Sequence, residues 1–449
     1  MASPNGWRQH ATDTLDALPG WVVYPLIAPD ESGARVTAQQ QVALGAPVRE
    51  HEHPRLGWIT VPRVRIGGRD LPVWVVLIAV FAVSRLVSTA LLALLWATTQ
   101  GQWFAHYDGG SDFWGYLQSW DVLWYHRVAF EWYPLELPID ANGDVKQNTW
   151  AFFPVFPAIV RGLMAVTGGD YFVVATVVAT VFGALATLAL HRLLAQHFAP
   201  TQALWGALFF ASGPMSWMLQ LAYAESAFLF FLFCAMAAMV SRRYLIMIPF
   251  ALVASFTHPG TLALAAALGL QGIFRLVRKQ PIRWHEWLTV GLAIFAITAA
   301  ALFWPVLIAQ LTGDPSGYFD TELGWWRQYL GRVIFVPWTP FFLLYGSLWG
   351  IWGVLLVVFV LGAVIFWLTR RSTRAIGVDL WTFTVMYIAY LTAVFLPTQS
   401  LIRMLLPLSP LLGHPGLSRT PRRRWTVLLV GALPLQAFAI FWLWVVYPP

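Results

Sequence analysis

The sequence predicts an all-α protein that crosses a membrane many times. Of its 449 residues, 58% are hydrophobic and only 11% are charged, whereas roughly a quarter of the residues in a soluble domain are charged. Apolar stretches long enough for membrane helices recur along most of the chain. Basic residues gather in alternate loops, as the positive-inside rule requires. These three observations exclude a soluble enzyme held by a single anchor.

The composition excludes other classes of protein as well. The single cysteine, Cys234, lies in an apolar stretch, so we expect neither a disulfide framework nor a cysteine-based metal site. The net charge of +7 reflects membrane topology rather than nucleic-acid binding. Aromatic residues make up 16% of the chain, including 26 tryptophans. Aromatic belts at the membrane interfaces explain so many aromatic residues, and a site that stacks sugar rings would also need aromatic side chains.

The N-terminal region, 1–71, differs from the rest of the chain. It is polar or mixed, shows no clear periodicity and begins without the pattern of a secretory signal peptide. We expect a flexible cytoplasmic tail there, followed by a multispan membrane domain at 72–449.

About eleven apolar segments are candidates for membrane spans. We expect them at roughly 73–98, 171–193, 202–219, 224–240, 244–257, 260–276, 287–311, 338–368, 380–396, 401–415 and 425–446. The apolar segment 151–167 is shorter and contains Pro154 and Pro157. It predicts an interfacial or re-entrant helix that packs on protein.

The distribution of basic residues predicts the orientation in the membrane. With the N-terminus inside, the cytoplasmic segments contain Arg55, Arg63, Arg65, Arg69, Arg192, Arg242, Arg243, Arg275, Arg278, Lys279, Arg283, Arg370, Arg371, Arg374, Arg419, Arg422, Arg423 and Arg424. The outer segments contain only Arg127, Lys146, Arg161, Arg327, Arg332 and Arg403. We therefore predict a multi-pass protein of the plasma membrane with a cytoplasmic N-terminus.

Two long segments lie on the predicted outer side. The first extracytoplasmic loop, 99–170, is expected to carry interfacial helices, and the second occupies 312–337. The first loop is acidic, with Asp108, Asp112, Asp121, Glu131, Glu136, Asp140 and Asp144. Ionisable residues at membrane depth are functional candidates by default, and those of this chain gather near the outer face.

Asp121, which follows Trp120 in the first outer loop, is the candidate general base. One well-placed carboxylate can remove the proton of an attacking hydroxyl, an effect of about 10²–10⁴-fold. The alternative is that Asp121 only caps a helix at Val122–Phe130, since Asp is a good N-cap. The two roles are compatible. Trp120 is a candidate substrate contact beside it.

Arg403 and His258 are candidates for binding a phosphate group of a donor. A guanidinium can make two parallel hydrogen bonds to phosphate and stabilise its charge as it departs. The alternatives are an interfacial arginine that reaches toward lipid headgroups and a structural histidine at a helix break. Deeper in the membrane, Arg85 must face protein or a cavity, and we expect a structural role for it.

Four further residues are candidate substrate contacts. Glu225 follows Tyr223 at the outer start of a span and could orient sugar hydroxyls, or could simply favour the helix dipole. Gln399 lies at the outer end of another span. Phe153 belongs to an aromatic segment that could line a groove or anchor the chain at the interface.

The sequence contains no pattern that demands a cofactor. It has no P-loop, no glycine-rich dinucleotide motif and no pair of histidines at metal spacing. A divalent cation stays open, because Asp108 and Asp112 could hold one weakly.

The outer location of the candidates restricts the reaction. The outer compartment normally lacks nucleotide sugars, so a transferase there needs a donor that crosses with its own lipid, such as a polyprenyl-phosphate sugar. Phosphate is a good leaving group, so one base and one cationic clamp could suffice. Direct in-line displacement with a single base would invert the anomeric centre.

Five segments in order resemble the PIG-V-like family, the second mannosyltransferases of GPI-anchor assembly and their bacterial relatives. They are Trp120-Asp121, Phe152-Phe153-Pro154-Val155-Phe156-Pro157, Ala222-Tyr223-Ala224-Glu225-Ser226-Ala227-Phe228, Ser255-Phe256-Thr257-His258-Pro259-Gly260 and Arg403-Met404-Leu405-Leu406-Pro407-Leu408-Ser409-Pro410. The resemblance covers roughly residues 75–415. His258 departs from it, because the family is expected to have arginine before that proline.

The resemblance implies a GT-C glycosyltransferase fold and inverting transfer of mannose from polyprenyl-phosphate-mannose. By position, Asp121 matches the catalytic carboxylate, and Glu225 and Arg403 match functional polar positions. The arginine-rich, cysteine-poor chain with its long tail is typical of a bacterium, specifically an actinobacterium. The acceptor would then be a cell-envelope glycolipid, glycan or protein.

Three alternatives stay open at this point. The same enzyme class could use a different polyprenyl-phosphate sugar. A lipid or sugar transporter or flippase would place its substrate groups near mid-membrane, and Arg85 is the one feature that favours it. A non-catalytic membrane scaffold would use Asp121 only as a helix cap.

Overall fold

The computed structural model describes residues 63–66, 69–99, 113–281 and 283–446, and the chain divides into two units, Met1–Val73 and Trp74–Pro449. In the first unit, β1 (Arg63–Ile66) and β2 (Arg69–Pro72) form an antiparallel hairpin in which Arg63 pairs with Pro72. Regular structure therefore begins inside the region expected to be a flexible tail. The remainder of that tail, 1–62, lies outside the described residues.

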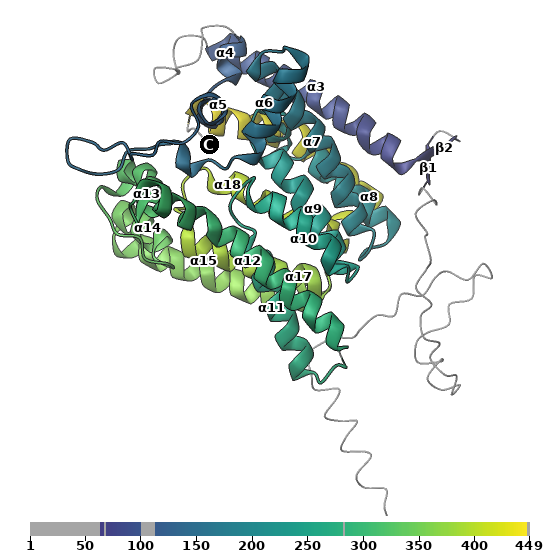
Figure 1. The fold of residues 1–449 in the computed structure, drawn as a ribbon. Helices are drawn as coiled ribbons and strands as arrows, with labels where there is room; N and C mark the ends of the chain where they lie inside the picture. The colour runs from purple at the N-terminus through teal and green to yellow at the C-terminus, as the bar shows by residue number, and fades with distance from the viewer. Residues whose placement is uncertain (1–62, 67–68, 100–112, 282, 447–449) are drawn as a thin grey trace, which may run out of the picture. The chain divides into compact units, whose positions relative to one another are not determined.

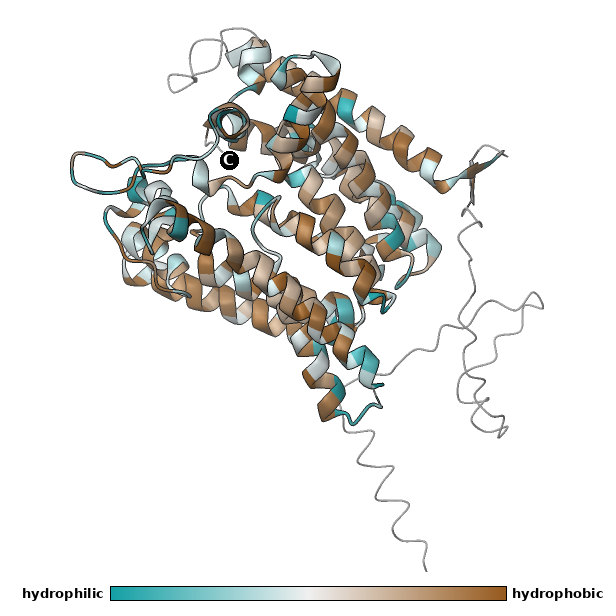
Figure 2. Ribbon diagram, in the orientation of Figure 1, coloured by the Kyte–Doolittle hydropathy of each residue, from teal (hydrophilic) through white to brown (hydrophobic). Residues whose placement is uncertain are grey.

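The second unit is helical, and five helices among its described residues are long and apolar enough to cross a membrane. They are α3 (Val73–Thr99), α7 (Tyr171–Leu194), α12 (Trp284–Thr312), α15 (Ile351–Thr369) and the C-terminal helix Pro421–Trp444. The last comprises α20 (Pro421–Val430), η4 (Gly431–Leu435), α21 (Gln436–Ile440) and the start of η5 (Phe441–Val446). Figure 2 shows hydrophobic residues along the helices and hydrophilic ones mainly at helix ends and in loops. The predicted class, a helical multi-pass protein, is confirmed.

Several predicted spans are shorter helices than a membrane crossing of about 20 residues needs. They are α8 (Pro200–Ser212), which is followed by the 3₁₀ helix η2 (Ser216–Gln220), α9 (Glu225–Val240), α10 (Tyr244–Ser255), α11 (Leu262–Val277) and α17 (Val378–Val394). The predicted span 338–368 is divided at Gly350, whose φ is 57°, into α14 (Pro340–Trp349) and α15. The number of about eleven spans stays a prediction.

The expected span at 401–415 is wrong as a single helix. It consists of α18 (Leu401–Met404), the 3₁₀ helix η3 (Leu406–Gly413) and the first residue of α19 (Pro415–Ser418). Pro407 and Pro410 explain this, because proline has no N–H to continue an α-helical ladder and its ring crowds the preceding turn. Arg403 lies in α18, at the start of this broken segment.

The first predicted outer loop carries short helices, as expected, and the second contains a helix that the sequence analysis did not predict. The first loop contains α4 (Phe113–Leu117), α5 (Asp121–Glu131), η1 (Thr149–Ala151) and α6 (Val155–Thr167), and the second contains α13 (Gly317–Leu330). One other short helix, α16 (Arg371–Arg374), follows α15. Figure 1 shows α5 beside α6 and α13 beside α14.

Arg85, in the middle of α3, has the structural role predicted for it. Its guanidinium donates hydrogen bonds to the backbone carbonyls of Ser216 and, at 3.0 Å, Ala211, and it lies over the Phe81 ring. These carbonyls flank the break between α8 and η2, where the helix ends without internal partners for them. Arg85 therefore satisfies a helix break within the membrane region.

Candidate functional site

Asp121 is the first residue of α5, and Trp120 rather than Asp121 occupies the N-cap position. The expectation that Asp121 caps this helix is therefore wrong in detail. Trp120 has φ 61° and ψ −127°, a region that costs a non-glycine residue about 1–3 kcal/mol. Its side chain packs in an aromatic and aliphatic cluster with Val122 and Tyr125. That packing holds the strained turn, which leaves the Asp121 carboxylate available for contacts elsewhere.

Two other helix ends supply the remaining ionic groups. Glu225 is the first residue of α9, and only 3% of its surface is exposed. Arg403 lies in α18, at the start of the broken segment. Glu225 therefore lies where a regular helix begins, and Arg403 lies where regular helical structure is interrupted.

The three groups meet in one ion cluster. Arg403 Nη1 lies 2.5 Å from Asp121 Oδ2 and 2.9 Å from Glu225 Oε1. The Arg403 guanidinium also lies over the ring of Tyr223, with Cζ 5.4 Å from the ring centroid. The structure thus brings together four of the residues predicted from sequence, although they are up to 282 positions apart along the chain.

Several polar atoms of this cluster are buried without a hydrogen-bond partner among the described residues. They are Glu225 Oε2, Tyr223 Oη, Arg403 Nε and, next to Glu225, Ser226 Oγ. Buried polar atoms are nearly always paired because an unmade hydrogen bond costs about 1–3 kcal/mol. Such a group of unpaired donors and acceptors is suited to a polar ligand.

A cleft of about 190 Å³ adjoins the cluster. It is lined by Glu225, Phe228, Leu229, His258, Tyr387, Arg403, Met404, Leu406 and Pro407. One wall is charged and the others are apolar, a combination typical of small-molecule sites. Tyr387, which donates a hydrogen bond to the Met404 carbonyl at 2.9 Å, was not predicted, because nothing in its apolar span distinguished it.

His258 lies in the cleft, in the turn between α10 and α11. Its Nδ1 is 2.9 Å from the Pro259 carbonyl oxygen, and its ring lies against Phe228. A carbonyl only accepts, so Nδ1 carries a proton. Burial lowers the pKa of His258 despite the Glu225 carboxylate, which favours the neutral ring with an unprotonated Nε2. Neutral His258 is thus a hydrogen-bond acceptor, which does not favour the predicted phosphate contact.

The environment of Asp121 shifts the pKa of its carboxyl upward. Burial raises the pKa of this carboxyl above its usual range, against the opposing charge of Arg403, and the Glu225 carboxylate raises it further. A carboxylate with a raised pKa is a stronger base, which suits proton abstraction near neutral pH.

Aromatic side chains border the Asp121 end of the site. Trp124, one turn after Asp121, stacks on Phe152 at 5.7 Å, and Trp325 of α13 meets both rings edge-on. Phe153 is buried against Trp304 and belongs to the core. Phe153 is therefore a core residue, and a groove wall in this segment stays a prediction.

Gln399 is not among the residues that line the cleft. Its Nε2 is 3.2 Å from the hydroxyl of Tyr329, at the end of α13. Within the described ranges, no group of three or more His, Cys, Asp or Glu residues is arranged to hold a metal ion. The loop acids Asp108 and Asp112 lie outside those ranges.

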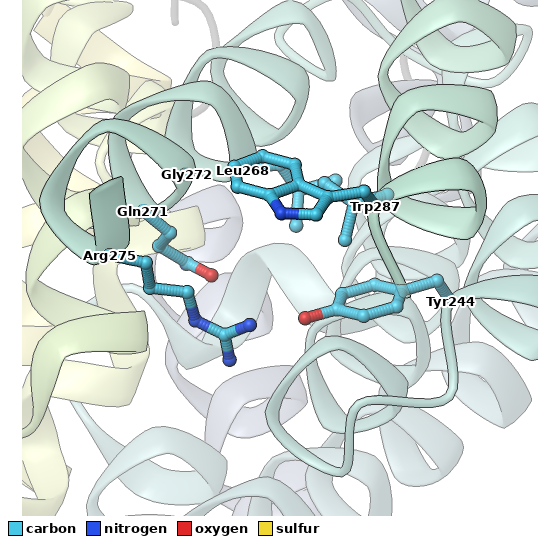
Figure 3. Close-up of a pocket in the computed structure, with 7 residues that line it drawn as sticks. Tyr244, Leu268, Gln271, Gly272, Arg275 and Trp287 are labelled. Atoms are coloured by element: carbon cyan, nitrogen blue, oxygen red, sulfur yellow. The ribbon is translucent and has the colours of Figure 1, made fainter. Parts of the chain in front are cut away.

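A second cavity, of about 250 Å³, lies near the other end of α11. It is lined by Tyr244, Leu268, Gln271, Gly272, Arg275, Trp287 and Val290. Figure 3 shows the Arg275 guanidinium and the Tyr244 hydroxyl facing one another beside Trp287. Arg275 pairs with Glu286 at 2.5 Å. About 20 Å of helix separates this cavity from the turn of His258.

The solved structures similar to this chain include two of one protein. Both are crystal structures of the oligosaccharyltransferase of Archaeoglobus fulgidus, one in complex with Zn and sulfate and one in the apo form. Their TM-scores are 0.42 and 0.41, each at 14% identity, over 80% and 83% of this chain. The match covers 52% and 55% of those proteins, so the chain spans about half their length. No family model and no curated protein matches the sequence.

Proposed function

We propose that the protein is a membrane glycosyltransferase that transfers a sugar from a polyprenyl-phosphate donor to a hydroxyl acceptor on the extracytoplasmic face. The observation that carries this proposal is the cluster of Asp121, Arg403 and Glu225, which combines a base, a cation and unpaired polar atoms beside a cleft. Mannose is the proposed sugar, on the resemblance of the sequence motifs alone.

Asp121 is the proposed general base. As the acceptor oxygen attacks the anomeric carbon, its proton passes to the Asp121 carboxylate. The new carbon–oxygen bond forms on the face opposite the phosphate, so the anomeric centre inverts. The bond from the anomeric carbon to the phosphate oxygen breaks, and its electron pair leaves with the lipid phosphate.

Arg403 is the proposed phosphate clamp. Its Nη1 is shared by two carboxylates, and its Nε is buried and unpaired. A donor phosphate that binds Nε and displaces Asp121 from Nη1 would remove the cation nearest to the base. Asp121 then becomes more basic only when the donor is in place, so we expect the donor to bind before the acceptor is activated.

Glu225 and Tyr223 are the proposed contacts to sugar hydroxyls, since Glu225 Oε2 accepts and Tyr223 Oη donates or accepts. The lone pair of neutral His258 Nε2 provides a further acceptor in the cleft. Trp120 has an indirect role, because its strained backbone sets the direction of Asp121.

The transporter alternative loses its main support. Arg85 was the one intramembrane charge that favoured transport, and its guanidinium is bound to backbone carbonyls at the break after α8. The orientation in the membrane rests on the basic residues, which place the ion cluster outside.

The test is sugar transfer in membranes that contain the protein, with labelled polyprenyl-phosphate-mannose and endogenous acceptors. We expect a labelled product that is lost in Asp121→Asn and kept in Glu131→Gln, which changes an exposed acid at the other end of α5. A product formed only with another lipid-linked sugar would mean that the enzyme class is right and that the sugar is not mannose. An absence of any product that depends on Asp121, with every such donor, would refute the proposal.

A further inference from the structure

The N-terminus of α9 is buried and has no cap. Its N-cap residue, Ala224, has no side-chain acceptor, and the first intrahelical bond of this end runs from the Phe228 N–H to the Ala224 carbonyl at 2.9 Å. The backbone N–H groups of Glu225, Ser226 and Ala227 have no hydrogen-bond partner among the described residues. These three residues are at most 3% exposed. A helix end that is buried without partners is uncommon, and it is suited to an anionic ligand.

The hydroxyl of Ser226, the second residue of α9, is a further donor at this end. It is buried and has no partner among the described residues. Two other buried serines within helices donate to the carbonyl four residues earlier, Ser212 to Leu208 at 2.6 Å and Ser255 to Ala251 at 2.9 Å. Ser226 makes no such bond, because α9 begins only one residue before it and no helical turn precedes it. Since Cα–Cβ bonds tilt toward the N-terminus of a helix, its hydroxyl lies at the same end as the unpaired N–H groups.

Arg403 brings a cation to this helix end. Its Nη1 is 2.9 Å from Glu225 Oε1, and its Nε is buried without a partner among the described residues. The cleft of about 190 Å³ adjoins them, since Glu225, Phe228 and Leu229 of α9 line it together with Arg403. The unpaired donors of α9 and of Arg403 therefore surround one end of the helix, beside the cleft.

The balance of charge explains why a phosphate would need these donors. Among the described residues that line the cleft, Arg403 is the only arginine or lysine, and it already pairs with the carboxylates of Asp121 and Glu225. Two acids thus share one cation, so an anionic ligand needs further positive partners. The N-terminus of a helix is equivalent to roughly half a positive charge, and its N–H groups are suited to phosphate oxygens.

We propose that the N-terminus of α9 forms the second half of the phosphate site, in which the Ser226 hydroxyl and the backbone N–H groups of residues 225–227 bind the oxygens of the donor phosphate that Arg403 binds through Nε. This inference rests on the proposed function for the identity of the anion. It adds Ser226 as a binding residue and gives the start of α9 a part in the reaction.

The same groups stabilise the leaving phosphate. When the bond from the anomeric carbon to the phosphate oxygen breaks, its electron pair stays on that oxygen, and the lipid phosphate gains one negative charge. A helix N-terminus and an arginine interact more strongly with the product than with the donor, so they lower the barrier to departure. Loss of the Ser226 hydroxyl should therefore reduce kcat as well as the affinity for the donor.

The experiment has a binding arm that needs no catalysis. The full-length protein in detergent is titrated with farnesyl phosphate and, separately, with farnesol, which has the same chain and no phosphate, and intrinsic tryptophan fluorescence reports binding. We expect the wild type to bind farnesyl phosphate about tenfold or more tighter than farnesol. Ser226→Ala should weaken the binding of farnesyl phosphate about tenfold, as for a hydrogen bond to a charged group, and leave that of farnesol unchanged.

The stability of the variant separates a ligand contact from a structural one. Ser226→Ala removes a buried hydroxyl without a partner, so without ligand its unfolding midpoint should equal or exceed that of the wild type. The control is Ser212→Ala, which removes a hydroxyl that bonds the Leu208 carbonyl and should leave the affinity for farnesyl phosphate unchanged.

Three outcomes would overturn the inference. The first is equal affinity of the wild type and Ser226→Ala for farnesyl phosphate. The second is a wild type that binds farnesyl phosphate no more tightly than farnesol. The third is a lower unfolding midpoint in Ser226→Ala with an equal loss of affinity for both ligands, since that pattern would make Ser226 a structural residue.

The same preparations are then assayed for transfer from lipid-linked sugars. If the wild type transfers sugar and Ser226→Ala keeps its kcat and its KM for the donor, the phosphate contact is overturned and the proposed function stands. If the wild type binds farnesyl phosphate through Ser226 but transfers no sugar from any donor, the proposed function is refuted and the anion site stands.

Discussion

The candidate site and the region near the end of α11 both contain arginine–carboxylate contacts, and they differ in how completely those contacts are satisfied. Near the end of α11, Arg242 binds both oxygens of Asp379 and also contacts Gln271, and Arg275 has its own partner in Glu286. Each acid there has one arginine. At the candidate site, Asp121 and Glu225 share the single nitrogen Nη1 of Arg403.

The difference shows which feature marks a functional site in this protein. Arginine–carboxylate pairs with a buried or half-buried acid occur in both regions, so an ion pair alone does not separate them. The candidate site combines an excess of carboxylates with unpaired polar atoms on Glu225, Tyr223 and Arg403. In the α11 region each carboxylate is paired with one arginine, so the two charges of each pair cancel. The combination of surplus carboxylates, unpaired polar atoms and an adjoining cleft, rather than charge alone, is thus what indicates a ligand.

The largest expected effect comes from removing the arginine of each region in turn. Arg403→Met removes the proposed phosphate clamp and should lower the rate of transfer about 10²–10³-fold, the usual effect of losing one group that stabilises a developing charge. Arg242→Met should keep transfer within a fewfold of the wild type. Both variants leave a carboxylate unpaired, which destabilises the fold. The thermal unfolding of each variant is therefore measured, and the transfer rate is expressed per amount of folded protein. Equal losses of transfer in folded protein would remove the distinction between the two regions.

The pH dependence of transfer sharpens the comparison further. Only the ionised form of Asp121 can accept a proton, and burial raises the pKa of that carboxyl. The value of kcat/KM should therefore rise with pH through an inflection above about 4, the usual value for aspartate. Well below that inflection each unit of pH should cost tenfold. The residual activity of the Asp121→Asn variant should not show this fall of kcat/KM at low pH, its acid limb.

Because Glu322 of α13 also titrates, with its pKa raised to about 7, the profile is best measured in the Glu322→Gln background. Removing Glu322 leaves Asp121 as the acid whose ionisation should set the limb. An acid limb at or below the ordinary aspartate range would contradict the assignment of Asp121 as the base.

Much of the fold could be predicted because its signals are local. The apolar stretches of α3, α7 and α12 end within a few residues of the predicted bounds, since hydropathy and flanking polar residues determine them directly. The positive-inside pattern also grouped Asp121, Glu225 and Arg403 near the predicted outer face, but their direct contact is visible only in the structure.

The rest depends on contacts between distant segments. The segment 401–415 has the composition of a span, and its apolar content concealed the effect of Pro407 and Pro410 on the helix. In the sequence Glu322 resembles the other acids of its loop, and its burial and its hydrogen bond from Tyr318 are visible only in the folded chain. The left-handed φ of Trp120 is held by tertiary packing that no local pattern encodes.

The smallest effect is expected from the Arg275–Glu286 pair at the second cavity. This pair belongs to the α11 region, where each acid has its own arginine. The two side chains are 20% and 27% exposed, and partly exposed pairs contribute about 0–1 kcal/mol. The double variant Arg275→Gln, Glu286→Gln keeps the shape and removes both charges, so it leaves no unpaired ion. We expect a shift in the unfolding midpoint of a few degrees at most and unchanged transfer. A large loss of transfer without loss of folded protein would mean that the α11 cavity takes part in activity, and pairing would then no longer distinguish a site from a structural contact.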